Sequence, residues 1–384
     1  MSFEFKFFLR ILIKNAYVSI VFPFLVLLAL ISRIFPKRKV IGLGPEPLIN
    51  NIYHKLALEK YGFKAETFVT DTYFITNSFD VVLNFPLRGL FSLVRSFYAY
   101  QCIYMYFNGS LFFKNTFLQS AEPLLFKIAG VKTVLMPYGG DVQELSRTEN
   151  LLFKSAMSKD YPMFRFQKTS IFNQIEGWQK YADFVFSGCE WVDYMTYWDK
   201  LMLAHFSINT DQIEPKYYEI SENPIKLLHA PNHKNIKGSD FFQKAIEELK
   251  KEGFNIEYEE IRGLPNVEVQ KKISKCDIVL DQLIIGWYAM TALEAMSYGK
   301  PVVCFLRKDL EELYIHEGIL EQDELPHINA TYKTIKDKLR HILSNKELIS
   351  SIGKKSRLFV EKHHSIKSVG KAFAEANKTL RLKA

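Results

Sequence analysis

The most informative stretch of the chain is residues 276–303, Cys276-Asp-Ile-Val-Leu-Asp-Gln-Leu-Ile-Ile-Gly-Trp-Tyr-Ala-Met-Thr-Ala-Leu-Glu-Ala-Met-Ser-Tyr-Gly-Lys-Pro-Val-Val303. An apolar strand ends at Asp281 and Gln282, Gly286 permits a tight loop, and a helix over 288–298 precedes a second apolar strand. This alternation of strand and helix predicts a parallel sheet with helices on both faces. Ligands bind such sheets at the carboxyl ends of the strands, where Asp281 and Gln282 stand.

The same alternation continues on both sides of this stretch. Strands are expected at 39–44, 63–70, 102–107, 132–136, 183–187, 225–229 and 254–261, with helices at 47–61, 88–101, 239–252, 266–275 and 345–380. A polar linker near 209–224 separates the two series. We therefore predict an α/β chain of two Rossmann-like domains facing each other across a cleft. The expected parts are an anchor at 1–36, a first domain at 37–210, a second domain at 211–345, and helices at 346–384 that cross back to the first domain.

The charge of the chain is concentrated at its N-terminus. The 384 residues carry a net charge of +8, and 48% of them are hydrophobic, which excludes a disordered chain. Seven basic residues and one acidic residue lie in 1–39, so this segment holds six of the eight net charges. The nearly neutral remainder gives no reason to expect a nucleic-acid partner. The four cysteines form no CxxC pair, which argues against a zinc module or disulfide framework and suits a reducing compartment.

The N-terminal segment has the composition of a membrane anchor. Residues 15–32 contain no charge and span about 27 Å as a helix, at about 1.5 Å per residue. Basic residues follow where a cleavage site would stand in a signal peptide. Lys6, Arg10 and Lys14 recur every four residues, as in a basic amphipathic segment for an anionic surface. We expect residues 1–36 to bind the cytoplasmic face of the inner (plasma) membrane. A span, a re-entrant hairpin kinked at Pro23 and an in-plane helix all remain open.

Eleven aromatic residues lie within Phe85–Phe117. Two interpretations stay open for them. They either pack helices on the sheet, as core aromatics do, or form a surface facing lipid or a lipid-linked acceptor.

Three features of the second half indicate a site for a nucleotide diphosphate. The loop at 229–238 brings His229, Asn232, His233 and Lys237 to a helix start, where backbone amides and added cations favour phosphate. The helix that contains Glu294 begins with the backbone amides of Ala289, Met290 and Thr291, which could meet a diphosphate. The Glu294 carboxylate can accept hydrogen bonds from ribose hydroxyls. The turn Arg262-Gly-Leu-Pro-Asn266 is a candidate loop for contacting the base, or a plain turn.

Together, Lys237-Gly238, the strand at 276–282 and the run Glu294-Ala-Met-Ser-Tyr-Gly-Lys-Pro-Val-Val resemble the donor half of the GT-B glycosyltransferases. The similarity is to the large retaining group-1 family (glycogen synthase-like and mannosyltransferase-like), strong over 225–305 and weaker elsewhere in 37–384. It implies a GT-B fold, a nucleotide-sugar donor and no bound metal or other cofactor. It also implies that Lys237 holds the donor diphosphate and Glu294 the ribose.

In the first domain, the resemblance implies that the loop at Tyr138-Gly139-Gly140-Asp141 faces the donor sugar, with Asp141 as a third catalytic candidate beside Lys237 and Glu294. Gly42 and Gly44 form a further loop at the end of the first strand. A dinucleotide fingerprint does not fit there, because its third glycine would fall at Pro47.

Two positions depart from the family pattern. Gly286 stands where the family often has a glutamate, and an arginine that usually accompanies the phosphate lysine is missing near Asn232 or His233. The expected function is still sugar transfer, with retention, to a lipid-linked or growing glycan acceptor in bacterial surface-polysaccharide assembly (lipopolysaccharide or capsule). The alternative is a non-catalytic scaffold subunit of a membrane polysaccharide complex.

Overall fold

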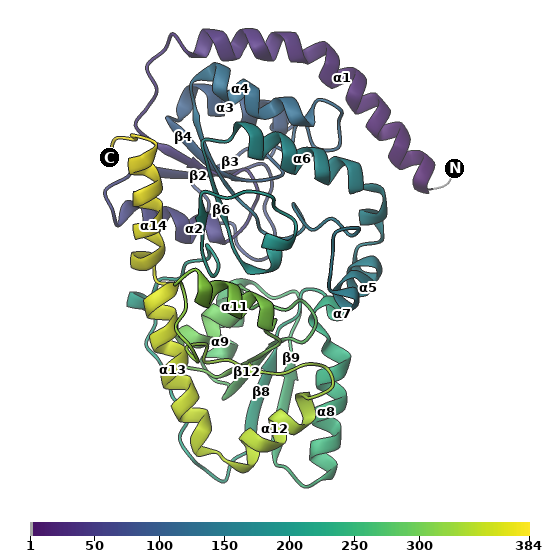
Figure 1. The fold of residues 1–384 in the computed structure, drawn as a ribbon, viewed down its shortest axis with the longest axis vertical. Coiled ribbons are helices and arrows are strands. Elements are labelled where there is room, and N and C mark those ends of the chain that lie inside the picture. Colours follow the sequence, from purple (N-terminus) through teal and green to yellow (C-terminus); the bar gives the residue numbers. More distant parts are fainter. Residues whose placement is uncertain (1–2) are drawn as a thin grey trace.

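Each half of the chain forms a parallel β-sheet flanked by helices in the computed structural model, which describes residues 3–384 (Figure 1). The first sheet has the strand order β3-β2-β1-β4-β5-β6-β7 and the second has β12-β11-β10-β8-β9. Strands β4 and β5 pair in parallel from Cys102↔Lys132 to Tyr106↔Met136, and β8 and β9 from Ile225↔Ile256 to His229↔Glu260. The prediction of two parallel-sheet α/β domains is therefore confirmed.

The strands of the first sheet are β1 (Ile41–Leu43), β2 (Ala65–Val69), β3 (Val81–Val82), β4 (Cys102–Tyr106), β5 (Lys132–Met136), β6 (Phe184–Ser187) and β7 (Lys200–Leu201). The strands of the second are β8 (Ile225–His229), β9 (Ile256–Glu260), β10 (Ile278–Gln282), β11 (Val302–Cys304) and β12 (Ile328–Asn329).

The helices of the first half are α1 (Phe3–Ser32), α2 (Asn50–Glu59), α3 (Arg88–Ala99), α4 (Glu122–Ala129), α5 (Leu151–Asp160) and α6 (Lys168–Tyr181). Those of the second half are α7 (Lys234–Lys237), α8 (Ser239–Lys251), α9 (Asn266–Ile273), α10 (Met290–Ser297), α11 (Lys308–His316), α12 (Ile335–Ser344), α13 (Glu347–His363) and α14 (Ile366–Thr379).

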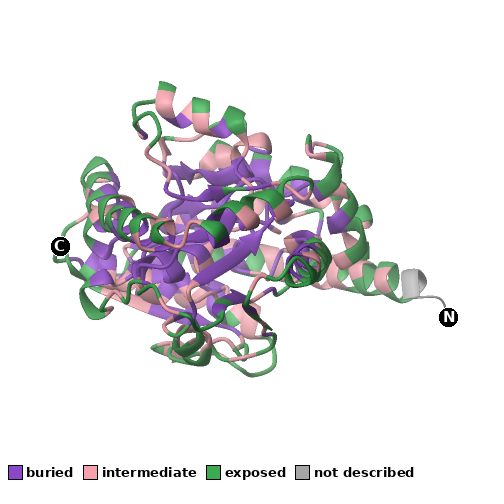
Figure 2. Cartoon of the chain, turned by 90° about the horizontal axis from the view of Figure 1, so that it is seen from below, coloured by how far each residue is buried: buried purple, intermediate pink, exposed green. Residues whose placement is uncertain are grey.

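The central strands are buried along their whole length. Every residue of β4 and of β10 is buried, as expected for strands of a parallel sheet covered by helices on both faces. Figure 2 shows these buried strands at the centre of the molecule, with the exposed faces of the helices around them.

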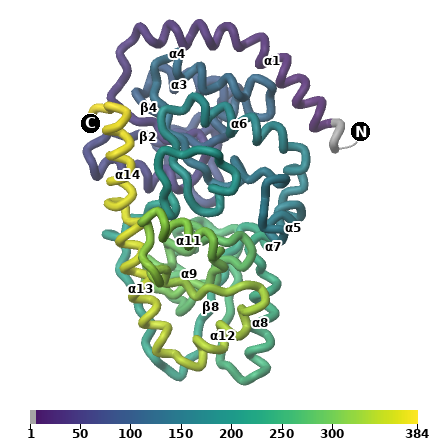
Figure 3. The backbone as a smooth tube through the Cα atoms, viewed as in Figure 1, coloured from purple at the N-terminus to yellow at the C-terminus, as the bar shows by residue number. Residues whose placement is uncertain are grey.

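The last two helices connect the domains along one side of the molecule. Helix α13 packs on α10 of the second domain, and α14 packs on α2 of the first. Figure 3 shows α14 continuing from the end of α13 to the side of the first domain. The approach is close, because a Cβ added at Gly370 would lie 2.5 Å from the carbonyl oxygen of Ala57.

Direct contacts between the domains fix the two sheets relative to each other. The Asn266 amide donates to the carbonyl of Ile75 (3.0 Å), and the Trp287 indole donates to the carbonyl of Leu203 (2.9 Å). The guanidinium of Arg307 pairs with Asp193, with both side chains about nine-tenths buried. Such contacts hold the carboxyl ends of the two sets of strands in a defined position.

Helix α1 is a single helix of 30 residues, which joins the basic segment and the uncharged run that the sequence separates. It lies across the outer side of the first domain, over α3 and α4 (Figure 1). By length and composition, its segment Lys6–Ser32 could cross a membrane.

Candidate functional site

Lys237 and Asp281 form an ion pair at the carboxyl end of β10. Lys237 ends the short helix α7, and its Nζ lies 2.6 Å from Oδ1 of Asp281, whose side chain is 1% exposed. The second carboxylate oxygen accepts a hydrogen bond from the Ala289 amide at 3.2 Å. One buried carboxylate therefore positions both the lysine and the start of α10.

The amides at the start of α10 differ in their availability. The Ala289 amide is engaged by Asp281, whereas Met290 and Thr291 belong to the first helical turn, whose N–H groups have no acceptor within the helix. Both residues line the pocket described below.

His229 is a structural residue. Its Nδ1 lies 2.7 Å from the carbonyl oxygen of Leu280, so this nitrogen donates, and Nε2 accepts from the Ser239 hydroxyl at 2.9 Å. Burial lowers the pKa of this imidazole to about 4, so it is neutral near pH 7. With both nitrogens occupied, His229 fixes the loop onto α8, and its contact with a donor stays a prediction.

The other two residues of this loop have different surroundings. Asn232 lines the pocket between the domains. The ring of His233 is hydrogen-bonded through Nε2 to the hydroxyl of Tyr161, and burial lowers its pKa. Nearby, Asp160 at the end of α5 accepts from the Ile236 amide at 3.0 Å, so the first domain contributes to holding the loop at 229–238.

Glu294 lies on α10 with 2% of the residue exposed. Its Oε1 accepts hydrogen bonds from the side-chain amides of Asn266 (2.6 Å) and Gln270 (3.4 Å). Burial raises the pKa of this carboxyl to about 7, against the lowering effect of these two hydrogen bonds. Gln270 also contacts the hydroxyl of Tyr53 on α2, at 3.3 Å, which connects the site to the first domain.

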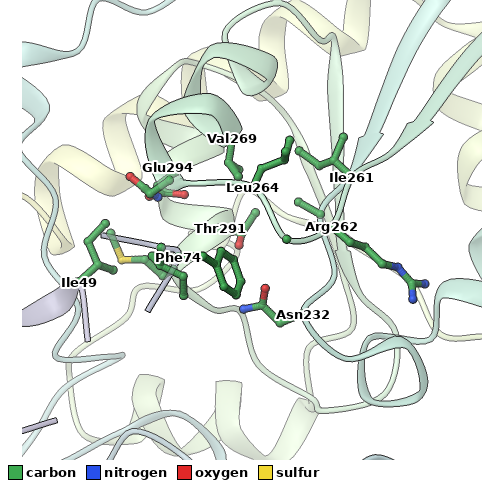
Figure 4. A pocket seen from close by; sticks show the side chains of 14 residues that line it. Ile49, Phe74, Asn232, Ile261, Arg262, Leu264, Val269, Thr291 and Glu294 are labelled. Carbon is green, nitrogen blue, oxygen red and sulfur yellow. The ribbon is translucent and has the colours of Figure 1, made fainter. Parts of the chain in front are cut away.

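A pocket of about 150 Å³ lies between the domains beside Glu294. The first domain contributes Ile49, Phe74 and Ile75, and the second contributes Ala230, Asn232, Ile261, Arg262, Gly263, Leu264, Asn266, Val269, Met290, Thr291 and Glu294. Figure 4 shows the Phe74 ring between Ile49, Thr291 and Asn232. The pocket thus combines an aromatic ring, apolar walls and a carboxylate at one end.

Arg262 contributes its backbone to this pocket and not its charge. The guanidinium donates to Glu260 Oε1 through Nε at 2.8 Å and points away from the pocket (Figure 4). The turn at 262–266 therefore presents main chain and the Leu264 side chain to the pocket.

Gln282 and Gly286 shape the loop between β10 and α10. The Gln282 side chain is buried, donates to the carbonyls of Trp287 (2.9 Å) and Phe305 (2.8 Å), and accepts from the amides of Ile284 and Ile285 (2.8 Å each). These bonds satisfy the amide group, so Gln282 holds the loop and does not reach a ligand.

Gly286 has φ +108°, a conformation that favours glycine, and a Cβ there would lie 2.6 Å from Cδ of Arg307. The side chain of Arg307 thus covers Gly286, the position at which the group-1 glycosyltransferases that the sequence resembles often have a glutamate.

In the first domain, Asp141 is completely buried and faces the protein. Its carboxylate accepts from the backbone amides of Phe107 (3.0 Å), Tyr138 (2.9 Å) and Gly139 (3.0 Å). Burial raises its pKa to about 7 even though these amides favour the ionised form. Asp141 thereby fixes the loop in which Gly139 adopts φ +126° and Gly140 packs near Phe164, and its role in orienting a sugar stays a prediction.

Gly42 and Gly44 lie in and directly after β1, where neighbouring groups exclude a side chain. A Cβ at Gly42 would lie 2.6 Å from the Tyr100 ring, and one at Gly44 would lie 2.0 Å from the carbonyl oxygen of Phe68. These glycines permit close packing of β1 against its neighbours, rather than contact with a ligand.

A polar group at the carboxyl ends of β1, β4 and β5 was not anticipated from the sequence. Glu46 Oε1 accepts from Asn108 Nδ2 at 2.5 Å and lies 3.4 Å from the Tyr138 hydroxyl, which itself accepts from Asn108 at 2.8 Å. Each of these residues follows a strand by two or three positions, and that spacing is the available signal. Gln270 and Arg307 are further residues of the site that no motif marked, and Asn266, which the sequence places in a candidate base-contacting turn, instead donates to Glu294.

Comparisons with solved structures identify the fold. The chain is similar to sucrose-phosphate synthase from Thermosynechococcus elongatus (12% identity, TM-score 0.58, 90% of this chain and 99% of that one). It is also similar to a mutant O-GlcNAc transferase from Thermobaculum terrenum (12%, 0.53, 90% and 68%) and to a protein from Listeria monocytogenes described as a UDP-N-acetylglucosamine 2-epimerase (12%, 0.52, 91% and 98%).

No protein-family model matches the sequence, and comparison with curated proteins finds no match. The three similar structures are named for different reactions, so what they share with this chain is the fold. The chain has the GT-B fold, two parallel-sheet α/β domains with a pocket between them, to which an N-terminal apolar helix is added.

Proposed function

We propose that the chain is a glycosyltransferase that moves a sugar from a nucleotide-diphosphate donor to an acceptor, with retention of anomeric configuration. The observation that carries the proposal is the combination of the interdomain pocket with Glu294 at its edge and the Lys237–Asp281–Ala289 arrangement at the start of α10. The GT-B fold and the resemblance of residues 225–305 to the retaining group-1 donor half support it.

In this proposal the nucleoside occupies the interdomain pocket. The base lies against Phe74 and the backbone at 262–264, and the ribose hydroxyls donate to the free oxygen of Glu294. The diphosphate then meets the amides of Met290 and Thr291 at the start of α10, a helix end that favours anions. Lys237, which pairs with the carboxylate oxygen of Asp281 that does not bind the Ala289 amide, adds a positive charge for the diphosphate.

The chemical step breaks the bond between the anomeric carbon and the leaving phosphate oxygen and forms a bond to an acceptor hydroxyl oxygen on the same face. The hydroxyl proton passes to the leaving phosphate. Lys237 and the helix amides stabilise the negative charge that develops there, an electrostatic contribution made by preorganised donors. The proposal includes no bound metal.

We further propose that the acceptor is lipid-linked or a growing glycan of a surface polysaccharide, reached at the cytoplasmic face of the inner membrane. The polar group Glu46–Asn108–Tyr138 stands at the carboxyl ends of the first-domain strands, where the half-buried Glu46 and Tyr138 supply a carboxylate and a hydroxyl for an acceptor and the buried Asn108 holds them together. The apolar helix α1 on the same domain supports the membrane location.

The test is a panel of nucleotide sugars, assayed by thermal shift and by release of the nucleoside diphosphate. Lys237→Ala should reduce turnover at least ~100-fold, as expected when one donor to the transition state is removed. Lys234→Ala is the matched control, because Lys234 lies on the same short helix but is exposed and paired with Asp240. Turnover at the wild-type level in Lys237→Ala would remove Lys237 from the site.

A non-catalytic scaffold subunit is the second candidate, and Arg307 beside Gly286 is the observation that favours it. A scaffold would bind the nucleotide through the same pocket without releasing a diphosphate from any donor. A thermal shift by nucleotides without turnover across the whole panel would therefore support this candidate over transfer.

A further inference from the structure

Helix α1 is an integral part of the first domain. One stripe of the helix, Val18, Leu25 and Ala29, is completely buried against α3 and α4. Aromatic rings join the contact, with Tyr17 at 5.9 Å from Phe112 between ring centroids. Burial of this stripe stabilises α1 lying along the domain.

Hydrogen bonds fix α1 to the domain near both ends of the uncharged run. At the start, Lys14 Nζ donates to the carbonyl of Lys114 at 2.7 Å, and the Asn15 side-chain oxygen accepts from the Phe117 amide at 2.9 Å. At the end, the Tyr98 hydroxyl donates to the carbonyl of Leu28 at 3.1 Å. A helix that stood perpendicular to the domain would lose all three bonds and expose the buried stripe.

The opposite face of α1 is apolar and exposed. The large side chains on it are Phe8, Leu12, Ile13, Ile20, Phe24, Leu27 and Leu30, with Ile34 and Phe35 directly after the helix, and each is more than half exposed. On this face the Ser19 hydroxyl donates to the carbonyl of Asn15 within the helix at 2.8 Å. A surface whose polar groups are hydrogen-bonded internally can be buried in hydrocarbon without loss of hydrogen bonds. Exposure of such a large apolar surface to water is unfavourable.

The charges at the two ends of this apolar face indicate what covers it. Lys6 and Arg10 are exposed at one end and Arg33 and Lys39 at the other, and the sequence contains no acid between Glu4 and Glu46. An apolar strip flanked by cations at both ends complements anionic lipid headgroups above an acyl layer. A protein partner would usually need a polar rim of both signs.

We infer that α1 binds in the plane of one anionic lipid leaflet, with its exposed face in the boundary between headgroups and acyl chains and its buried stripe still packed on α3 and α4. The protein is thereby monotopic, with both ends of α1 on the side of the catalytic domains. The inference refines the location proposed above and does not depend on the sugar-transfer reaction.

The first experiment is flotation of the full chain with preformed vesicles. Vesicles containing phosphatidylglycerol should carry the protein, and pure phosphatidylcholine vesicles should carry less. The combined variant Ile20→Glu, Phe24→Glu and Leu27→Glu should lose at least ~10-fold in bound fraction, because three charges would enter the apolar boundary. Leu358→Glu is the control, since Leu358 is 65% exposed on α13, far from α1.

All of these side chains are more than half exposed, so the melting temperatures of the variants should match that of the wild type. Equal flotation of the triple variant and the wild type would overturn the inference, as would failure of the wild type to float.

The second experiment separates an in-plane helix from a span. The four native cysteines are buried, so Lys6→Cys and, on α8, Lys251→Cys each introduce one exposed thiol. In vesicle-bound protein, a membrane-impermeant maleimide added outside should label both variants to the same extent. Labelling of Lys251→Cys alone would place residue 6 in the lumen and show a span. Neither experiment uses a nucleotide sugar, so its failure is distinct from failure of the proposed reaction.

Discussion

Replacement of Lys237 by methionine should lower the free energy of unfolding of the protein, in addition to weakening the proposed donor site. The substitution keeps most of the side-chain volume and removes the charge 2.6 Å from Asp281, a carboxylate that is 1% exposed. The carboxylate would retain only the Ala289 amide at 3.2 Å and the Cys304 thiol at 3.8 Å as partners.

Breaking a buried pair typically costs about 3–5 kcal/mol, because one charge stays desolvated without its partner. The Ala289 hydrogen bond remains and the Lys237 side chain is 13% exposed, so we take the lower end, about 3 kcal/mol. At about 2–4 °C per kcal/mol for a domain of this size, the melting temperature should fall by about 6–12 °C.

The double variant Lys237→Met with Asp281→Asn provides the decisive comparison. A neutral amide at 281 still accepts from Ala289 and needs no cation, so the double variant should be more stable than Lys237→Met alone by at least about 1 kcal/mol. Urea unfolding and thermal melts of wild type, both single variants and the double variant, at one pH and ionic strength, measure this coupling. A Lys237→Met variant that melts within about 1 °C of wild type, or a double variant less stable than Lys237→Met, would refute the reasoning.

Three further predictions concern the buried carboxyls and Gly286. The pKa of Glu294 in the folded protein is about 7, above its ordinary value of 4.5, so ionisation of this group opposes folding and its contribution to stability falls as pH rises from about 4.5 to 7. The stability of Glu294→Gln relative to wild type should therefore improve by about 2 kcal/mol between pH 5 and pH 8 in urea titrations, and a pH-independent difference would contradict the assigned pKa. Gly286→Glu, which introduces the residue typical of the resembling family, should destabilise by about 2 kcal/mol or more through its positive φ and its contact with Arg307, without a gain in turnover. Asp141→Asn should cost about 2 kcal/mol, because an amide NH₂ would face a backbone N–H, while nucleotide affinity in calorimetry stays within about twofold; a large loss of affinity at unchanged stability would instead return Asp141 to the site.

The architecture was accessible from the sequence because it depends on local pattern. The strands at 132–136 and 225–229 coincide with β5 and β8, since each is a short apolar run between breaks in hydrophobic periodicity. The short edge strands β3, β7 and β12, of two residues each, carry too little pattern to be recognised.

The orientation of polar side chains was less accessible, because their partners are distant in the sequence. His229 ends β8 and Asp141 follows β5, so both lie at the carboxyl edge of a sheet, where ligands bind in such folds. Their hydrogen bonds nevertheless go to Leu280 and Phe107, 51 and 34 residues away. The spacing in the sequence places these residues at the carboxyl edge of the sheet. It does not show that other groups of the protein already form hydrogen bonds with their side chains. The arrangement of α1 was left open for the same reason, since Lys114 and Phe117, which hold it, are about 100 residues away.

The contacts of Lys14 and Asn15 with the segment 111–117 also bear on how this protein should be prepared. That segment continues from Asn108, which contacts Glu46 and Tyr138, and it contains Leu111 and Asn115 in left-handed conformations. Deleting residues 1–36, to obtain protein that needs no detergent, would remove helix α1 and with it the contacts that hold the segment 111–117. Kinetic constants measured on the truncated form would then reflect a disturbed surface next to the proposed acceptor group of the first domain. Full-length protein in lipid nanodiscs is therefore the appropriate material for assays of acceptor preference.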